Sequence, residues 1–494
     1  MKRIKIALVN PGPLDAVIDE ERRGAVTASH PPLGILYISA MLKKENYHVD
    51  VIDQAAYGFN LEQILKWIKR KDPDVLGLST ITLSIFSLNA TAIAKEIKKW
   101  NPNLKIVFGN RHATYNDVRI LKKYDFVDAC VRHEGEYTFL ELINAFSKQL
   151  PLKNIRGITY SENGRIIQNE DRERIKDLDA LPFPDRKSLK AQYKARFGVL
   201  DLVPSGYTSF TASRGCPRNC TFCDGTRTKG YRVRSIENVI EELEILQNEG
   251  YKFINFIDDN FTLNRKRVIK LCSMMRKNKI ELDWMCEGRV DQASLEMLEN
   301  MQKSKCRVLF YGMESANQRI LNYYRKGITP NQMISAVNNA RRAKIPFLVG
   351  SFIVGAPGET FQEIKNTLEF FFKLDIDYPA VNVLFSMPGT DIWDDLVEKK
   401  IINPDSYWET GVIVPDIDPS GVPTSKIYNL TIRMLKKFLS RPKYVLREIY
   451  MNFTNSYRLQ NGIRILVNNI KNFKQFRGIR SLAWWGEHKP LDAY

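Results

Sequence analysis

The chain alternates between short apolar runs and longer amphipathic stretches, and this alternation restricts the possible folds more than any other feature. In residues 1–150 the apolar runs have the length of buried strands. Between them apolar residues recur every three or four positions, as they do in helices. Such βαβ units predict an α/β domain with a Rossmann-like, doubly wound parallel sheet. The predicted strands lie at residues 4–10, 48–53, 75–82, 105–110 and 128–133.

The loops that follow these strands are the candidate ligand-binding sites of the first domain. Ligands of doubly wound sheets bind beyond the carboxyl ends of the strands, where neighbouring loops meet. In this chain those loops are residues 10–13, 79–83, 109–114 and 133–136.

The same alternation returns in residues 206–400. Six strand-like runs, separated by helical stretches such as 235–249 and 362–374, predict an open, partial (β/α)6 barrel. The chemistry of such barrels lies at the carboxyl ends of the strands. The predicted strands are residues 207–213, 253–259, 283–289, 308–314, 347–355 and 380–386.

Two further segments complete the predicted organisation. Residues 151–205 read as a hairpin with an Asn-Gly turn, followed by an extended linker that contains prolines. Residues 401–494 form a helical, basic C-terminal region. Between residues 426 and 480 we count 13 lysines and arginines and one acid, Glu448.

Three of the seven cysteines, Cys216, Cys220 and Cys223, crowd into the stretch SRGCPRNCTFCDG with the spacing C-x3-C-x2-C. A structural zinc site takes four protein ligands, and no fourth cysteine or histidine lies nearby. Three thiolates suit a [4Fe–4S] cluster that keeps one iron open; a zinc or redox thiol site is the alternative. The other cysteines stand alone in apolar surroundings, so we expect no disulfide framework and a reducing, intracellular setting.

This cysteine motif resembles the signature of radical S-adenosylmethionine (SAM) enzymes. It follows a strand at the start of a βα barrel, and the aromatic Phe222 precedes the last cysteine. The resemblance implies that the open iron chelates the amino and carboxylate groups of SAM. An electron from the cluster then cleaves the sulfonium bond, and the resulting 5′-deoxyadenosyl radical abstracts hydrogen from an unactivated carbon.

The same resemblance implies a SAM site at the strand ends. Many members carry a Gly-Gly-Glu turn where this chain has Asp258-Asp259-Asn260. Arg289 suits a carboxylate, and Glu287 or Glu314 suits a ribose hydroxyl or an ammonium group. No catalytic residue is expected beyond the cluster. The expected SAM contacts are Phe222, Asp258, Asp259, Glu287, Arg289, Glu314, Ser315, Gly355 and Gly358.

The order of the two domains resembles the B12-binding-domain class of radical SAM proteins. The matching stretches include HPPLGILYISAML, VLGLST, VFGNRHAT and VRHEGE. The resemblance implies a cobalamin site, but no D-x-H-x-x-G pattern offers a lower axial imidazole, and Asn110 stands where a glycine is usual. A domain that serves only as a lid is the alternative. The expected cobalamin contacts are Pro11, Ser79, Thr80, Gly109, His112, Glu134 and Gly135.

A net charge of +18 favours anionic partners. The basic tail, which includes Trp484 and Trp485, suits peripheral contact with a membrane or plain packing, and nucleic acid is not expected. No run is long enough to span a bilayer, so we expect a cytoplasmic protein, free or peripheral at the inner membrane surface.

The expected function is cobalamin-dependent C-methylation of an isoprenoid or other lipid, with flavodoxin or ferredoxin as reductant. A radical SAM enzyme that forms a ring or a C–C bond is the first alternative. An RNA-modifying methylthiolating enzyme needs three more cysteines in the first domain, which has only Cys130. A non-enzymatic iron–sulfur or B12-binding regulator is the last alternative.

Overall fold

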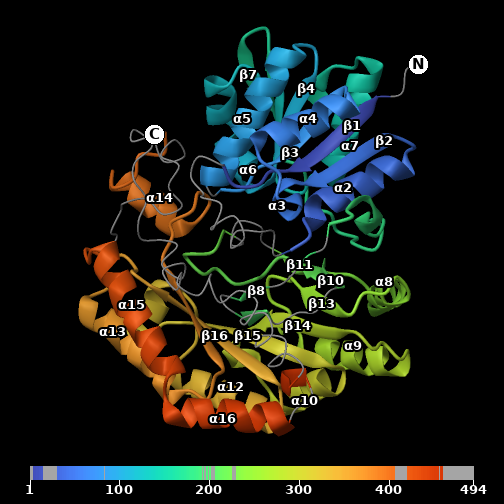
Figure 1. Cartoon of the computed structure of the whole chain (residues 1–494). Helices are drawn as coiled ribbons and strands as arrows, with labels where there is room; N and C mark the ends of the chain where they lie inside the picture. Colours follow the sequence, from blue (N-terminus) through green and yellow to red (C-terminus); the bar gives the residue numbers. More distant parts are fainter. Residues whose placement is uncertain are drawn as a thin grey trace. The chain divides into compact units, whose positions relative to one another are not determined.

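The computed structural model describes residues 4–14, 30–82, 84–191, 193, 196–197, 200–201, 206–224, 230–405, 420–454 and 457–459. The chain divides into two compact units. The first consists of Met1–Tyr193 with Ile402–Pro415 and Lys489–Tyr494, and the second of Lys194–Ile401 with Asp416–His488. Most of the first unit is blue to blue-green in Figure 1, and most of the second is green to red.

The first unit contains a seven-stranded sheet with the order β2-β1-β3-β4-β5-β6-β7. Its first five strands pair in parallel, which confirms the predicted doubly wound arrangement. The order reverses between β1 and β3, the kind of place where such sheets bind ligands. These strands are β1 (Lys5–Asn10), β2 (His48–Asp53), β3 (Val75–Ser79), β4 (Lys105–Gly109) and β5 (Ala129–Val131).

The sheet is mixed rather than wholly parallel. The predicted hairpin, β6 (Ile158–Glu162) and β7 (Arg165–Gln168), pairs antiparallel with β5 and so extends this sheet. Asn163 and Gly164 form its turn with φ of 52° and 73°, the left-handed geometry of a two-residue hairpin loop. The tight turn makes β6 and β7 antiparallel to each other, while α7 lies in the chain between β5 and β6.

Helices cover both faces of the first sheet. Ile6 and Leu8 of β1 belong to the core beneath α2 and α7, whereas the alternate residues Ala7 and Val9 are buried against the other face. On that other side α4 packs against α5. The helices are α2 (Leu33–Lys44), α3 (Gln54–Tyr57), α4 (Leu61–Lys71), α5 (Ser84–Trp100), α6 (Asn110–Lys123) and α7 (Glu136–Lys148).

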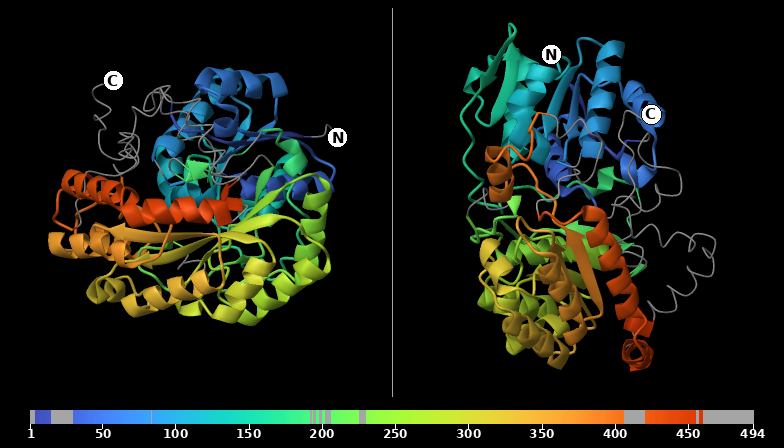
Figure 2. Two further views of the ribbon diagram at one scale, coloured as in Figure 1. Left: turned by 60° about the horizontal axis from the view of Figure 1, so that its bottom comes forward. Right: turned by 90° about the vertical axis from the view of Figure 1, so that its left-hand side faces the viewer.

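The second unit contains six parallel strands in the order β10-β13-β14-β15-β16-β17, which follows the chain and confirms the predicted partial barrel. Figure 2 shows helices along the outer side of this sheet. The strands are β10 (Tyr207–Phe210), β13 (Phe253–Phe256), β14 (Asp283–Gly288), β15 (Cys306–Glu314), β16 (Phe347–Val354) and β17 (Tyr378–Val383). The helices are α8 (Ile236–Asn248), α9 (Arg265–Lys277), α10 (Leu295–Lys303), α11 (Gln318–Tyr323), α12 (Pro330–Arg342) and α13 (Phe361–Phe370).

In the part of the chain that the structure describes, three more helices follow the barrel: α14 (Asp391–Glu398), α15 (Thr424–Leu439) and α16 (Pro442–Thr454). α15 packs against α13 and β17. The rest of the predicted basic tail, with Trp484 and Trp485, lies outside the described residues. Within the described part of the chain, no helix has both the length and the apolarity that crossing a bilayer requires.

Candidate functional site

The cysteine loop begins where β10 ends, at the carboxyl edge of the second sheet. The short antiparallel pair β11 (Ser213–Arg214) and β12 (Arg232–Val233) closes its base. Gly215 has φ of 82°, so the turn into Cys216 needs a residue without a Cβ. The three cysteines form no disulfide, and among the described residues no three metal-ligating side chains lie close enough to hold an ion.

Hydrogen bonds from distant elements fix the backbone of this loop. Oδ2 of Asp259, just after β13, accepts from the N–H of Gly215 at 2.8 Å. The N–H of Thr221 donates to the carbonyl of Tyr324 at 3.1 Å, and its hydroxyl donates to the carbonyl of Tyr323 at 3.1 Å. The loop is therefore anchored before its first cysteine and again between its second and third.

Asp258 supports the same loop from beneath. Its Oδ2 accepts from the N–H of Ala212 at 3.1 Å, and its Oδ1 accepts from the hydroxyl of Ser213. Burial raises the pKa of this carboxyl to about 6, although the hydrogen bond from Ser213 acts in the opposite direction. Asp258 and Asp259, both predicted to contact SAM, therefore bind the backbone around the cysteine motif. Next to them, the buried amide nitrogen of Asn260 has no hydrogen-bond partner among the described residues.

A buried ion pair stands beside the loop. Nζ of Lys326 donates to Oε1 of Glu314 at 2.6 Å, and both side chains are less than 10% exposed. The ammonium group also lies 5.8 Å from the ring centroid of Phe222, within the range of a cation–π contact. Burial raises the pKa of the Cys220 thiol, while the positive charges of Lys326 and Arg289 counter that rise. Lys326 was not predicted, because it lies 103 positions after the motif in a loop without a strand signal.

The guanidinium group of Arg289 makes hydrogen bonds to other residues of the protein. Its Nε and Nη2 bind the two carboxylate oxygens of Asp291 at 2.9 and 3.2 Å. Nη2 also donates to the carbonyl of Lys326 at 2.6 Å. Asp291 in turn accepts from Arg218 of the cysteine loop at 3.2 Å. Arg289 thus links the end of β14 to the lysine that faces Cys220.

Glu287, near the end of β14, keeps its carboxylate open. The side chain is exposed and has no hydrogen-bond partner among the described residues. Enough protein surrounds it that desolvation raises the pKa of its carboxyl, and the negative charge of Glu314 adds to the effect. Ser315 differs, since its buried hydroxyl lies 3.0 Å from Oγ1 of Thr367.

The turn after β16 is held by a buried acid that was not predicted. Oε2 of Glu359 accepts from the N–H groups of Gly355 at 2.7 Å and Ala356 at 3.0 Å. Burial raises the pKa of Glu359 to about 7 even though these bonds favour the charged form. Gly355 and Gly358 have φ of 89° and 68°, so both predicted glycines are required by the backbone.

In the first unit, hydrogen bonds join the loops after β3 and β4. Thr80 donates to the carbonyl of Gly109 from its N–H at 2.8 Å and from its hydroxyl at 2.7 Å. The N–H of His112 donates to the carbonyl of Thr80 at 3.0 Å. Burial lowers the pKa of His112 to about 3, so its ring is neutral. Asn110 has φ of 75° and donates from Nδ2 to the Ser79 hydroxyl at 3.0 Å.

The loop after β1, which contains Pro11, rests on polar residues that the sequence did not single out. Oε1 of Gln54 accepts from the N–H of Gly12 at 3.0 Å and from Nδ2 of Asn89 at 2.9 Å. The buried Asp53 accepts from the Tyr193 hydroxyl at 2.9 Å, and burial raises the pKa of its carboxyl to about 6. This cluster fixes the loop next to the switch point of the sheet.

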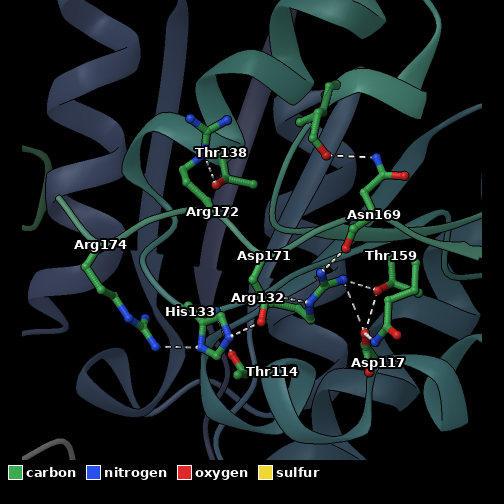
Figure 3. Close-up of polar contacts among 12 residues, drawn as sticks. Thr114, Asp117, Arg132, His133, Thr138, Thr159, Asn169, Asp171, Arg172 and Arg174 are labelled. Carbon is green, nitrogen blue, oxygen red and sulfur yellow. Dashed lines mark hydrogen bonds and ion pairs between the residues drawn. The ribbon is translucent and has the colours of Figure 1, made fainter. Parts of the chain in front are cut away.

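A polar network fastens the segment after β7 to the end of β5 (Figure 3). The buried Arg132 donates from Nε to Oδ1 of Asp171 at 2.8 Å and forms an ion pair with Asp117 at 3.4 Å. His133 has φ of 63°, and its N–H donates to the Thr114 hydroxyl at 2.9 Å. The ring of His133 lies between Asp171, at 3.2 Å, and Arg174, at 3.1 Å.

Glu134 and Gly135 lie in the turn that this network positions. Oε2 of Glu134 accepts from the N–H of Ile175 at 2.9 Å, so its carboxylate holds the chain after the hairpin. Gly135 is the residue before α7, and Ile38 would lie 3.2 Å from a Cβ built on it. The backbone of this turn is thereby closely packed.

Comparisons with known proteins agree with this architecture. The model of the radical SAM superfamily matches residues 210–371, and the model of the B12 binding domain matches residues 23–143. A Pyrococcus horikoshii protein named an uncharacterized methyltransferase is 36% identical over 94% of this chain and 99% of its own length. An anaerobic magnesium-protoporphyrin IX monomethyl ester cyclase of Cereibacter sphaeroides is 25% identical over 84% of this chain and 68% of its own.

Solved structures with a similar fold are also found. One of them is the radical S-adenosylmethionine methyltransferase TsrM from Kitasatospora setae, solved with cobalamin and a [4Fe-4S] cluster bound. The match has a TM-score of 0.65 with 18% identity and covers 81% of this chain and 75% of the other.

The residues present fit the cofactors that the two family models imply. The cysteine loop supplies three thiols, and the cations of Lys326 and Arg289 offset the negative charge of a thiolate-ligated cluster. The open carboxylate of Glu287 is available to a polar group of SAM. In the first unit, a Cβ built on Gly109 would have no neighbour within 4 Å, so the end of β4 is open at this predicted cobalamin contact.

The cofactors of this chain are therefore a [4Fe–4S] cluster, SAM and cobalamin. Both domains are matched, and one relative is more than a third identical along nearly all of the chain. The chain belongs to the radical SAM superfamily, in the cobalamin-dependent class that carries an amino-terminal B12-binding domain.

Proposed function

We propose that this enzyme transfers a methyl group to an unactivated carbon atom of its substrate. The observation that carries the proposal is a loop of three cysteines, backed by buried cations, in a chain that also has a B12-binding domain. The name of the Pyrococcus horikoshii relative, a methyltransferase, supports the same reaction class. When bound, the cluster supplies the electron that cleaves one SAM, and cobalamin carries the methyl group that a second SAM provides.

The residues of the chain bind and position rather than exchange protons. Asp259 and Thr221 hold the cysteine loop at the carboxyl edge of the second sheet, where its three thiols would ligate the cluster. The carboxylate of Glu287 accepts hydrogen bonds from an ammonium or from ribose hydroxyls there. Glu359 keeps the turn after β16 in the shape that an adenosine would lie along. Positioning of this kind accounts for large rate accelerations in enzymes.

The test begins with anaerobic purification in the presence of cobalamin, followed by a count of iron, sulfide and cobalt. With a strong reductant and SAM, the wild type is expected to release 5′-deoxyadenosine. Cys216→Ala is expected to abolish the cluster and the cleavage. Cys272→Ala, which changes a buried thiol outside the loop, is the matched control and is expected to keep both. Retention of SAM cleavage in Cys216→Ala would refute the assignment of the loop.

A second candidate function is ring formation without methyl transfer. The named cyclase of Cereibacter sphaeroides is the observation in its favour. Methylation consumes a second SAM and produces S-adenosylhomocysteine beside 5′-deoxyadenosine, whereas cyclisation produces only the latter. Cell extracts incubated with methyl-deuterated SAM therefore separate the two: both reactions release deuterated methionine, but only methylation moves the deuterated methyl group into the product made from the substrate. An isoprenoid or other lipid substrate, and flavodoxin or ferredoxin as the reductant, stay predictions that the same extracts can test.

A further inference from the structure

One face of α16 is fastened across the amino ends of β16 and β17. The hydroxyl of Tyr444 donates to the carbonyl of Asp377 at 2.7 Å, and Arg447 donates to its carboxylate at 3.0 Å. Just beyond the helix, Nε of Arg458 donates to the carbonyl of Pro346 at 2.6 Å. Asp377 and Pro346 each immediately precede a strand, so α16 lies at the end of the sheet opposite the cysteine loop.

The other face of α16 carries a stripe of large apolar side chains that are exposed to solvent. Leu446, Tyr450 and Phe453 are 66%, 65% and 80% exposed. Val445 and Ile449 continue the same stripe, since positions three, four and seven apart share one side of a helix. A contiguous exposed apolar patch of this kind marks an interaction site rather than ordinary surface.

Exposed cations gather at the same end of the unit. The helices that cover the sheet run antiparallel to the strands, so they end at this edge, and their last turns are rich in lysine and arginine. The helix dipole favours cations there but gives no reason for the apolar stripe. Seven such side chains have no ion-pair partner among the described residues: Lys277, Lys279, Lys303, Arg342, Lys344, Lys373 and Lys436.

We propose that this end of the second unit binds the surface of an anionic lipid bilayer, with α16 lying in the interface. An interfacial helix buries a stripe of leucine, tyrosine and phenylalanine among the headgroups, while the surrounding cations attract anionic lipids. This inference rests on the surface alone and does not depend on the proposed reaction. If the methyl-transfer test failed, the membrane-binding proposal would be unaffected.

Two other occupants of this face fit less well. An acidic electron-carrier protein would dock far from the cluster loop, because β16 alone is eight residues and about 26 Å long. A second copy of the chain would bring the same cations face to face, and like charges across an interface oppose association. Only a lipid surface matches both the apolar stripe and the charge without these costs.

The experiment is co-sedimentation of the full-length protein with vesicles. We expect binding to vesicles of phosphatidylcholine with phosphatidylglycerol, weaker binding at high salt, and little binding to phosphatidylcholine alone. Leu446→Ser with Phe453→Ser is expected to lower the partition coefficient at least about tenfold, because both side chains would enter the interface. Leu150→Ser, at an exposed leucine just after α7 in the first unit, is the control and is expected to bind like the wild type.

Four outcomes would overturn the proposal. The first is equal binding to both kinds of vesicle or to neither. The second is unchanged binding by the α16 variant. The third is a lower melting temperature or altered oligomeric state of that variant, which would show that the chain itself or a second copy covers the stripe. The fourth is loss of affinity for reduced flavodoxin in that variant alone, which would assign the face to an electron carrier.

Discussion

The ammonium group of Lys326 and the carboxylate of Glu314 form a 2.6 Å hydrogen bond at the carboxyl edge of the second sheet, and both are almost fully buried. Water solvates neither charge well, so each charged group is stabilised mainly by its partner in the pair. The ammonium group of Lys326 lies over the ring of Phe222, and its positive charge acts on the thiol of Cys220. A structural ion pair thereby becomes part of the electrostatic surroundings of the cluster.

Lys326→Met is expected to act on stability and on the cluster together. The variant leaves Glu314 buried without a partner, which typically costs about 3–5 kcal/mol of unfolding free energy. It also removes a positive charge beside a cysteine ligand, so the reduction potential of the cluster is expected to fall. Thermal unfolding and a redox titration followed by electron paramagnetic resonance measure the two effects.

The double variant Lys326→Met with Glu314→Gln separates these effects. Without the buried carboxylate, stability is expected to return toward that of the wild type, whereas the potential recovers only in part. Lys303→Met, at an exposed lysine, is the control for loss of a positive charge. An unchanged potential in Lys326→Met would contradict the electrostatic role.

Asp259→Ala is expected to reduce assembly of the cluster. The substitution removes the acceptor of the Gly215 N–H, and a hydrogen bond to a charged group contributes about 1.5–3 kcal/mol. Asp259→Asn keeps an oxygen acceptor at the same place and is expected to load more iron than the alanine variant. Iron and sulfide per chain after reconstitution provide the measurement. Equal loading of both variants would show that this bond does not shape the loop.

Glu359 is expected to give the protein a pH dependence of stability between about pH 4.5 and 7. Its carboxyl has a pKa of about 7 in the folded chain against an ordinary value of 4.5, so the folded state holds a proton that the unfolded chain releases. Stability therefore falls as pH rises through this window and levels off above it, by up to about 3 kcal/mol from this group.

Glu359→Gln isolates that contribution. The amide keeps an oxygen for the N–H groups of Gly355 and Ala356 but cannot ionise. The difference in unfolding free energy between variant and wild type is expected to move in favour of the variant as pH rises from 5 to 8. Denaturant titrations at four pH values measure it, and a constant difference would mean that Glu359 is not protonated near neutrality.

Arg132→Met is expected to destabilise the first unit and release the segment after β7. Its loss leaves Asp117 buried without a cation, at a cost of about 3–5 kcal/mol, and frees Asp171 (Figure 3). Asp171→Asn, at a half-exposed acid, is expected to change stability by less than about 1 kcal/mol. Thermal unfolding and limited proteolysis near residues 169–175 distinguish the Arg132→Met variant from the Asp171→Asn variant. Equal protease resistance in all three proteins would count against the anchoring role.

The strand pattern could be read from the sequence because each strand is a buried apolar run with a clear beginning. The predicted runs at β10 and β13 continue three residues too far. The reason is local: beyond Phe210 the N–H of Ala212 bonds to the Asp258 carboxylate rather than to a neighbouring strand. Side-chain acceptors of this kind leave no periodic signal in a sequence.

The cysteine ligands could be predicted because their spacing is local, whereas their supports could not. Lys326 and Glu359 act through contacts with residues that the chain brings together only on folding, and each would pass for an ordinary surface residue in the sequence. Asp258 and Asp259 were singled out, but the partners that they bind, 44–46 positions earlier, are visible only in the structure.

The dependence of the cysteine loop on β13 has a consequence for how the enzyme matures. The loop precedes β13 in the chain, yet the acids that shape its backbone arrive only when β13 has paired with β10. Iron and sulfide delivered to a nascent chain would therefore meet an unshaped loop. Cofactor insertion is expected to follow folding of the sheet, so the biogenesis of this enzyme runs from polypeptide to metal and not the reverse.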